Sequence, residues 1–266
     1  MKVTILVSCA VICFSSVAFS SSVDKSLIFL QKYGYLDGTP TRSNKFSRLK
    51  RENNYSEALK RFQRLYGLNP TGIADKETLL AMDLPRCGVK DPNTSKQTIQ
   101  KRNAVLNKPL WKKRDLTYTI SQYSHHLNRS LVEHEIERAF AEWSKYTDFT
   151  FTNSKSQNAD IDIRFERDHV YGDSFYGDNS LIAYTQVNKD GMRLIHFNDE
   201  KKWNFNGKSD SLFWTALHEI GHILGLDHTN VIGSVMWPTS CLSFSELQSY
   251  DIQAIQELYG LKKTHG

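Results

Sequence analysis

The spacing of hydrophobic positions divides the chain into a helical stretch and a longer mixed stretch. Between residues 24 and 84, apolar side chains recur every three to four positions, first around Leu30 and then from Ala58 to Tyr66. Gly67 is placed to end the second of these helices, and Asp75 is placed to begin a third as its N-cap. Three short helices bury only a small core, so the pattern predicts a small bundle that assists a larger domain.

From Pro85 onward the chain is polar and has no period, which predicts a linker over residues 85–102. Beyond Trp111, alternation of apolar and polar residues predicts strands at 116–120, 149–151 and 161–165. Helical spacing predicts further helices at 131–146, 212–226 and 246–259. Because strands and helices mix along this stretch, we expect residues 103–266 to form an α+β domain.

The first twenty residues have the composition of a secretory signal peptide. Lys2 supplies a positive charge, an apolar run extends from Val3 to Phe19, and Ala18 and Ser20 are the small residues of a cleavage site. The alternative is a membrane anchor, but the run is shorter than the about 20 apolar residues of a span, and serines interrupt it. We therefore expect a secreted, extracellular protein whose mature part has no transmembrane segment.

Composition narrows the function further. Of the 266 residues, 24% are charged and 39% hydrophobic, which is typical of a globular domain. The net charge of +5 is spread along the chain, and no basic cluster interleaved with aromatic residues indicates nucleic-acid binding. Without the signal peptide only Cys87 and Cys241 remain, too few for a disulfide scaffold. The two can pair with each other or serve separate roles.

The distinctive chemistry lies in the pattern His218-Glu219-x-x-His222-x-x-Gly225-x-x-His228. Residues four apart share one face of a helix, so His218 and His222 can bind one metal ion. Gly225 suits a turn with positive φ that ends the helix and brings His228 round as a third ligand. Three imidazoles leave one zinc position open to water, as in catalytic sites. Glu219 is placed to take a proton from that water and deliver it to a leaving amine.

Two further residues bear on this site. Met236, within Ser234-Val-Met-Trp-Pro238, is either a core residue or the methionine turn found beneath the three histidines of metzincins. Cys87, within Pro85-Arg86-Cys87-Gly88, is either a structural thiol or a thiolate ligand that fills the open zinc position and keeps the site latent.

Together these motifs resemble those of the matrix metalloproteinases, whose cysteine switch is similar to Pro85-Arg86-Cys87-Gly88. The similarity extends to the family's propeptide and to the first strand of its catalytic domain, at residues 30–36, 58–67, 71–72 and 111–118. The resemblance implies a twisted five-stranded mixed sheet with three helices, after a three-helix prodomain, in a minimal form without a hemopexin-like domain. It also implies that Glu219 is the general base and that Arg86 helps to seat the switch. The expected division is a signal peptide at 1–20, a propeptide at 21–102 and a catalytic domain at 103–266.

The departures from the family concern its other metal sites. Members carry a structural zinc and calcium ions before the active-site helix, but only His169 and His196 remain of the four structural-zinc positions, with Tyr171 and Tyr184 at the other two. Acidic calcium ligands are replaced at Tyr176, Leu194, Asn198 and Lys201. Two imidazoles make a weak site unless a neighbour such as Asp173 helps. We therefore expect one catalytic zinc ion and leave calcium binding open.

Substrate is expected to lie extended along an edge strand near Ile182 and Ala183, pairing through backbone hydrogen bonds. Its next side chain would enter a pocket between the active-site helix and the loop from Pro238 to Ser249. Trp214, one turn before His218, is either a core residue or part of the pocket mouth, where it would favour medium-sized side chains.

The resemblance implies extracellular protein substrates, an activating protease and protein inhibitors as partners. Lys101-Arg102 is a candidate convertase site, and cleavage by another protease or by the enzyme itself is the alternative. Another metzincin type, astacin-like or adamalysin-like, is disfavoured by the switch around Cys87. A catalytically silent zinc-binding or peptide-binding module is disfavoured because Glu219 and all three histidines are retained.

Overall fold

The computed structural model describes residues 22–36, 45–92, 109–156, 158–167, 180–205, 211–240 and 246–263. Outside these residues lie the predicted signal peptide, Lys101-Arg102, His169, Tyr171, Asp173, Tyr176 and Cys241. The chain divides into two compact units, residues 1–84 with 90–102 and residues 85–89 with 103–266. Among the helices of the described residues, none has the length and apolar character needed to cross a membrane.

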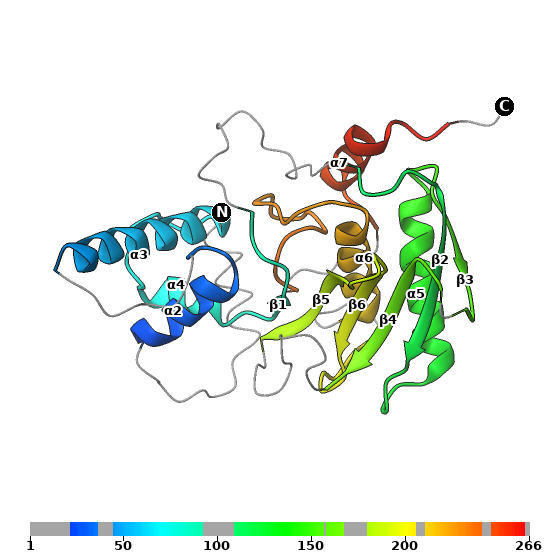
Figure 1. The fold of residues 1–266 in the computed structure, drawn as a ribbon, viewed down its shortest axis with the longest axis horizontal. Helices are drawn as coiled ribbons and strands as arrows, with labels where there is room; N and C mark the ends of the chain where they lie inside the picture. The colour runs from blue at the N-terminus through cyan, green and yellow to red at the C-terminus, as the bar shows by residue number, and fades with distance from the viewer. Residues whose placement is uncertain are drawn as a thin grey trace. The chain divides into compact units, whose positions relative to one another are not determined.

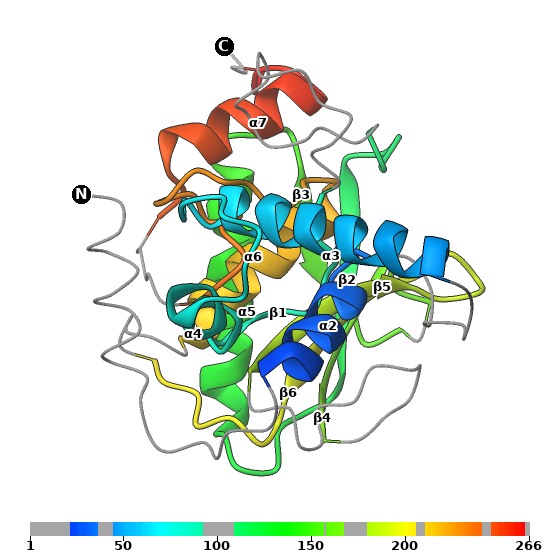
Figure 2. The same cartoon turned by 90° about the vertical axis from the view of Figure 1, so that its left-hand side faces the viewer.

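The first unit contains three helices, α2 (Ser22–Lys32), α3 (Lys45–Leu65) and α4 (Lys76–Met82). Helix α2 packs against both others (Figure 2). Phe62 lies at the centre of an aromatic core, with ring contacts to Phe29, Tyr35 and Tyr66. The predicted ends are confirmed: Asp75 caps α4 by accepting the backbone N–H of Thr78 at 2.8 Å, and Gly67 follows α3 with φ +68°.

The second unit is built on a six-stranded sheet in the order β1-β5-β6-β4-β2-β3 (Figure 1). The strands are β1 (Arg86–Cys87), β2 (Asp115–Gln122), β3 (Thr150–Asn153), β4 (Ile161–Glu166), β5 (Leu181–Val187) and β6 (Arg193–Asn198). Neighbours are parallel except for the antiparallel pair β5 and β6. The mixed α+β architecture is confirmed, and the five expected strands are joined by β1, a segment for which the sequence predicted only a linker.

Helices α5 (Arg129–Ser144) and α6 (Leu212–Ile223) lie on one face of the sheet (Figures 1 and 2). The indole Nε1 of Trp143 joins them by donating to the carbonyl oxygen of Leu217 at 3.0 Å. Residues 161, 163 and 165 of β4 point into the apolar core beneath these helices. The strand residues between them therefore point to the opposite face.

Several helix ends differ from the prediction by a few residues, among them both ends of α5, and two of these differences have a clear local cause. Helix α6 ends at Ile223 because Gly225 takes φ +102°, and the N–H of Leu226 bonds back to the carbonyl of Gly221 at 2.9 Å. Helix α7 (Ser249–Tyr259) begins three residues later than its pattern suggested, because Gln248 and Asp251 form a capping box at its start.

Candidate metal centre

Helix α6 and the turn after it bring the three predicted histidines together. His218 and His222 lie one turn apart, and His228 returns beside them after the turn at Gly225. The Nε2 atom of His218 lies 3.1 Å from that of His222 and 3.3 Å from that of His228. In a tetrahedral zinc site, with Zn–N bonds of about 2.0–2.1 Å, ligand nitrogens lie about 3.3 Å apart. The spacing of the three rings therefore fits a zinc ion.

Backbone carbonyls fix the orientation of two of these rings. Nδ1 of His218 donates to the carbonyl oxygen of Val235 at 2.6 Å, and Nδ1 of His222 donates to that of Leu226 at 2.7 Å. Because a carbonyl only accepts, each Nδ1 carries the proton and each Nε2 presents its lone pair to the centre. Burial, with the neighbouring imidazoles, holds the pKa of His222 well below its usual value. The ring is therefore neutral, which is the form that binds metal.

Cys87 completes the cluster. Its Sγ and the three imidazoles lie within 4.8 Å of one another, and all four side chains are buried. Searching the described residues for His, Cys and acidic groups with metal-ligand spacing finds this cluster and no other. Burial, with the nearby Glu219 carboxylate, raises the pKa of the Cys87 thiol well above its usual value, while the backbone N–H of Val89 lies 3.3 Å from Sγ. A thiol with this environment ionises only if a cation binds beside it.

Glu219 is buried next to these ligands. Within the described part of the chain, neither of its carboxylate oxygens has a hydrogen-bond partner. Burial raises the pKa of Glu219 to about 8, an effect that the Cys87 thiol partly offsets. An unpaired buried carboxylate is destabilising, and such groups concentrate at functional sites. The arrangement suits a proton acceptor that works beside a bound cation.

The segment that carries Cys87 is an extended strand held on both sides. Toward β5, the N–H of Arg86 donates to Ser180 at 2.7 Å, and that of Gly88 donates to Ala183 at 2.8 Å. On the opposite side, the N–H of Cys87 donates to Pro238 at 3.0 Å. Gly88 is required here, because a Cβ at this position would lie 2.7 Å from the Leu181 side chain.

The predicted substrate-binding residues gather beside this strand. Ile182, Trp214 and Pro238 line a cavity of about 10 Å³ next to His218, and Ala183 offers its carbonyl to Gly88. Thr239 and Ser240, which also line the cavity, belong to the loop from Pro238 to Ser249 that the sequence predicted as a wall. Sequence reasoning did not single out Thr215 and Trp237, and their signal was their position next to Trp214 and Pro238. The cavity has room for about one water molecule.

Met236 lies against α6 between the ligands. Its side chain is fully buried, and a Cβ at Gly221 would lie 2.4 Å from its sulfur. The carbonyl of Met236 accepts the N–H of Thr229 at 3.0 Å, which ties this turn to the residue after His228. The turn therefore packs against α6 between His218 and His222 and is hydrogen-bonded to the residue after His228.

The family model described as Matrixin matches residues 110–260 of this chain. The chain belongs to the matrixin family. A second model, described as "Putative peptidoglycan binding domain", matches residues 28–82, the helical unit that precedes the catalytic part of a matrixin. Matrixins are zinc metallopeptidases, and this matrixin has the helical prodomain of a zymogen.

Its curated relatives include several collagenases. Interstitial collagenase B of Mus musculus is 38% identical over 77% of this chain and 44% of its own length. Neutrophil collagenase of Homo sapiens is 35% identical over 88% of this chain and 49% of its own length. Interstitial collagenase of Sus scrofa is 34% identical over 91% of this chain and 51% of its own length. This matrixin spans about half the length of the curated relatives it matches.

Proposed function

We propose that this matrixin is a secreted zinc endopeptidase that is made as a latent zymogen and cleaves extracellular proteins. The observation that carries the proposal is the convergence of three imidazole Nε2 atoms and the Cys87 thiol beside the unpaired carboxylate of Glu219. The proposed division is a signal peptide at 1–20, a propeptide at 21–102 and a catalytic domain at 103–266.

In this proposal His218, His222 and His228 hold the zinc ion. Bound there, zinc would polarise the scissile carbonyl and make a water molecule more acidic. Glu219 accepts the proton of the attacking water on its carboxylate and passes it to the nitrogen of the leaving amine. Its burial keeps bulk water from competing for that proton. Burial also raises the pKa of Glu219, and a cation bound nearby would lower it.

In the latent form, the segment around Cys87 blocks the active site in two ways. The Cys87 thiolate would occupy the fourth zinc position, from which it excludes the attacking water. The backbone of Pro85 to Gly88 also uses the hydrogen-bonding groups of β5 and of Pro238 that an extended substrate would need. Removal of the thiol alone therefore gives partial activity, and full activation also withdraws the strand, for which cleavage in the linker is the proposed means.

The small cavity beside His218 supports a proposal on specificity. Trp214 lies on the turn of α6 before His218 and lines the cavity together with Trp237. The indole Nε1 of Trp237 donates to Thr239 Oγ1 at 2.9 Å, which holds this wall in place. We propose that the pocket accepts side chains up to medium size and rejects long ones.

The experiment that tests the proposal is cleavage of a quenched generic matrix-metalloproteinase peptide by the purified zymogen. Activity should be low at first, appear after treatment with a mercurial or trypsin, and disappear with a zinc chelator. The Glu219→Ala variant should stay inactive after the same treatment while still binding zinc. No cleavage by treated, zinc-loaded protein across a panel of peptides would overturn the proposal in favour of a binding module.

Secretion is tested separately. Expression of the full chain in animal cells should release a protein whose first residue, read by N-terminal sequencing, is Ser21. Retention of the protein in the membrane fraction with residues 1–20 intact would contradict this part of the proposal.

A further inference from the structure

His196 lies at the centre of β6 on the sheet face that points away from α5 and α6. Its neighbours Ile195 and Phe197 belong to the core beneath those helices, so the His196 ring lies on the opposite side of the strand. The ring is completely buried and stacks on Tyr184 of β5, with centroids 4.6 Å apart and planes 15° from parallel. This histidine is one of the two that remain from the structural-zinc positions expected by resemblance.

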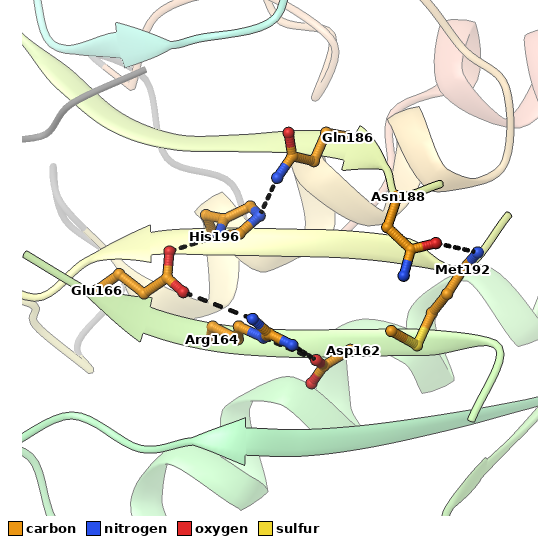
Figure 3. Close-up of polar contacts among 7 residues, drawn as sticks. All are labelled: Asp162, Arg164, Glu166, Gln186, Asn188, Met192 and His196. Carbon is orange, nitrogen blue, oxygen red and sulfur yellow. Dashed lines mark hydrogen bonds and ion pairs between the residues drawn. The ribbon is translucent and has the colours of Figure 1, made fainter. Parts of the chain in front are cut away.

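Both ring nitrogens of His196 have protein partners (Figure 3). Nδ1 lies 2.7 Å from Oε2 of Glu166, and Nε2 lies 2.8 Å from the amide nitrogen of Gln186. A carboxylate accepts and an amide nitrogen donates, so these contacts place a proton on Nδ1 and direct the Nε2 lone pair at Gln186. In this arrangement neither ring nitrogen of His196 offers a free lone pair to a metal ion.

The contacts continue across β4. Asp162, Arg164 and Glu166 alternate along the strand and share its outer face, as Figure 3 shows. The guanidinium of Arg164 forms a 2.7 Å ion pair with Asp162 and lies 4.0 Å from Oε1 of Glu166. Glu166 therefore lies between the imidazole N–H of His196 and the guanidinium of Arg164. Hydrogen bonds at His196, the 4.0 Å contact between Arg164 and Glu166, and the ion pair of Arg164 with Asp162 thus link side chains from three adjacent strands.

The turn between β5 and β6 fixes how these two strands pair, and so how Gln186 and His196 are aligned. The side-chain oxygen of Asn188 accepts the N–H groups of Asp190 and Met192, both at 2.9 Å. The antiparallel pairing that follows places Tyr184 opposite His196, two residues from Gln186. This turn thus fixes the positions from which Tyr184 and Gln186 reach the ring.

Among the residues that the structure describes, the donor set around His196 does not fit a zinc ion. Tyr184 stacks on the ring instead of offering a nitrogen, and binding of His196 to a metal would require breaking a hydrogen bond to Gln186 or Glu166. Both ring nitrogens of His196 are hydrogen-bonded to side chains of neighbouring strands. These contacts already link β4, β5 and β6, as a bound metal ion would.

We propose that Gln186, His196, Glu166, Arg164 and Asp162 replace the structural zinc of the family with a metal-free ladder of side chains. The chain then binds one zinc ion, at the three-histidine cluster, and its sheet does not depend on metal. The ladder belongs to the sheet and does not depend on whether the protein cleaves peptides.

The test uses the full zymogen carrying Glu219→Ala, which prevents self-digestion, with histidines labelled with nitrogen-15. Elemental analysis should give one zinc per chain. The imidazole spectrum of His196 should show a neutral ring protonated at Nδ1, unchanged when a chelator removes zinc, whereas the signals of His218 should change. A second zinc per chain, or a His196 signal that shifts with chelator, would overturn the proposal. Loss of zinc binding at His218 with His196 unaffected would instead count against the proposed function.

A stability measurement gives a second readout. Gln186→Leu should lower the thermal midpoint by about 2–8 °C, by the same amount with and without chelator. Gln253→Leu, on the exposed face of α7, is the matched control and should leave the midpoint unchanged. If the Gln186 effect disappears once metal is removed, His196 is serving a metal site and the proposal is wrong.

Discussion

His218 donates its Nδ1 proton to the carbonyl oxygen of Val235 at 2.6 Å. The N–H of the same Val235 is held by the carboxylate of Asp251, at 3.0 and 3.1 Å, and Asp251 lies at the start of α7. Helix α7 therefore orients His218, the first of the proposed metal ligands, through one residue of the methionine turn. Such indirect contacts tune a metal site without touching the ion.

We predict that Asp251→Ala weakens zinc binding about 10–100-fold, because Val235 loses its anchor and His218 its fixed orientation. Competition with a chromogenic chelator measures this affinity. Tyr250→Ala, at the exposed neighbouring position of α7, is the control and should bind zinc as the unmodified chain does. Equal zinc affinity in both variants would show that α7 does not orient the ligand.

Replacing Cys87 should release part of the latency. Cys87→Ser lacks the soft sulfur ligand but keeps the backbone bonds of β1 to β5, so the intact zymogen should show activity without a mercurial, below that of the cleaved enzyme. The measurement is peptide cleavage by protein shown to be uncleaved on a gel. A variant as silent as the original zymogen would place latency in the strand alone.

Opening the cavity should change specificity. Trp214→Leu removes part of the wall beside His218, so kcat/KM for peptides with a long side chain in the pocket should rise about 10–200-fold relative to peptides with a small one. Rates for the small side chain are the internal control. An unchanged ratio, in a variant whose thermal midpoint shows that it folds, would mean that Trp214 is a core residue only.

The turn after α6 should tolerate no side chain. Gly225 has φ +102°, and a Cβ there would lie 3.2 Å from Leu110 and 3.3 Å from Leu258. Gly225→Ala should lower the free energy of unfolding by about 1–3 kcal/mol and also weaken zinc binding, because His228 follows the turn. Gly191→Ala has a similar φ of +84° with open space around it, and should show the backbone cost without the loss of zinc. Chemical denaturation with a zinc titration separates the two effects.

Local chemistry made much of this architecture predictable. The spacing of His218, His222 and His228 and the position of Gly225 specify the ligands and the turn, because helix geometry relates residues close in sequence. The cap at Asp75 was predictable for the same reason.

The remaining features depend on partners distant in sequence. The sequence of strand β6 shows no alternation of apolar and polar residues, because residues 194–198 are buried on both faces of the sheet. Strand β1 has only two residues, both buried, which is too short for an alternation of apolar and polar side chains to mark it. The partners of His196 come from two other strands, and the sequence alone left open whether a second zinc or calcium ion binds near that histidine.

The optical spectrum of the zymogen with cobalt in place of zinc shows directly whether Cys87 binds the metal. A thiolate ligand gives a charge-transfer band that histidines alone do not. We expect this band in the intact zymogen, its absence in Cys87→Ser, and its loss in step with the appearance of peptidase activity during mercurial treatment. Activity that appears while the band persists, or a zymogen that binds cobalt without the band, would contradict the claim that Cys87 holds the metal centre latent.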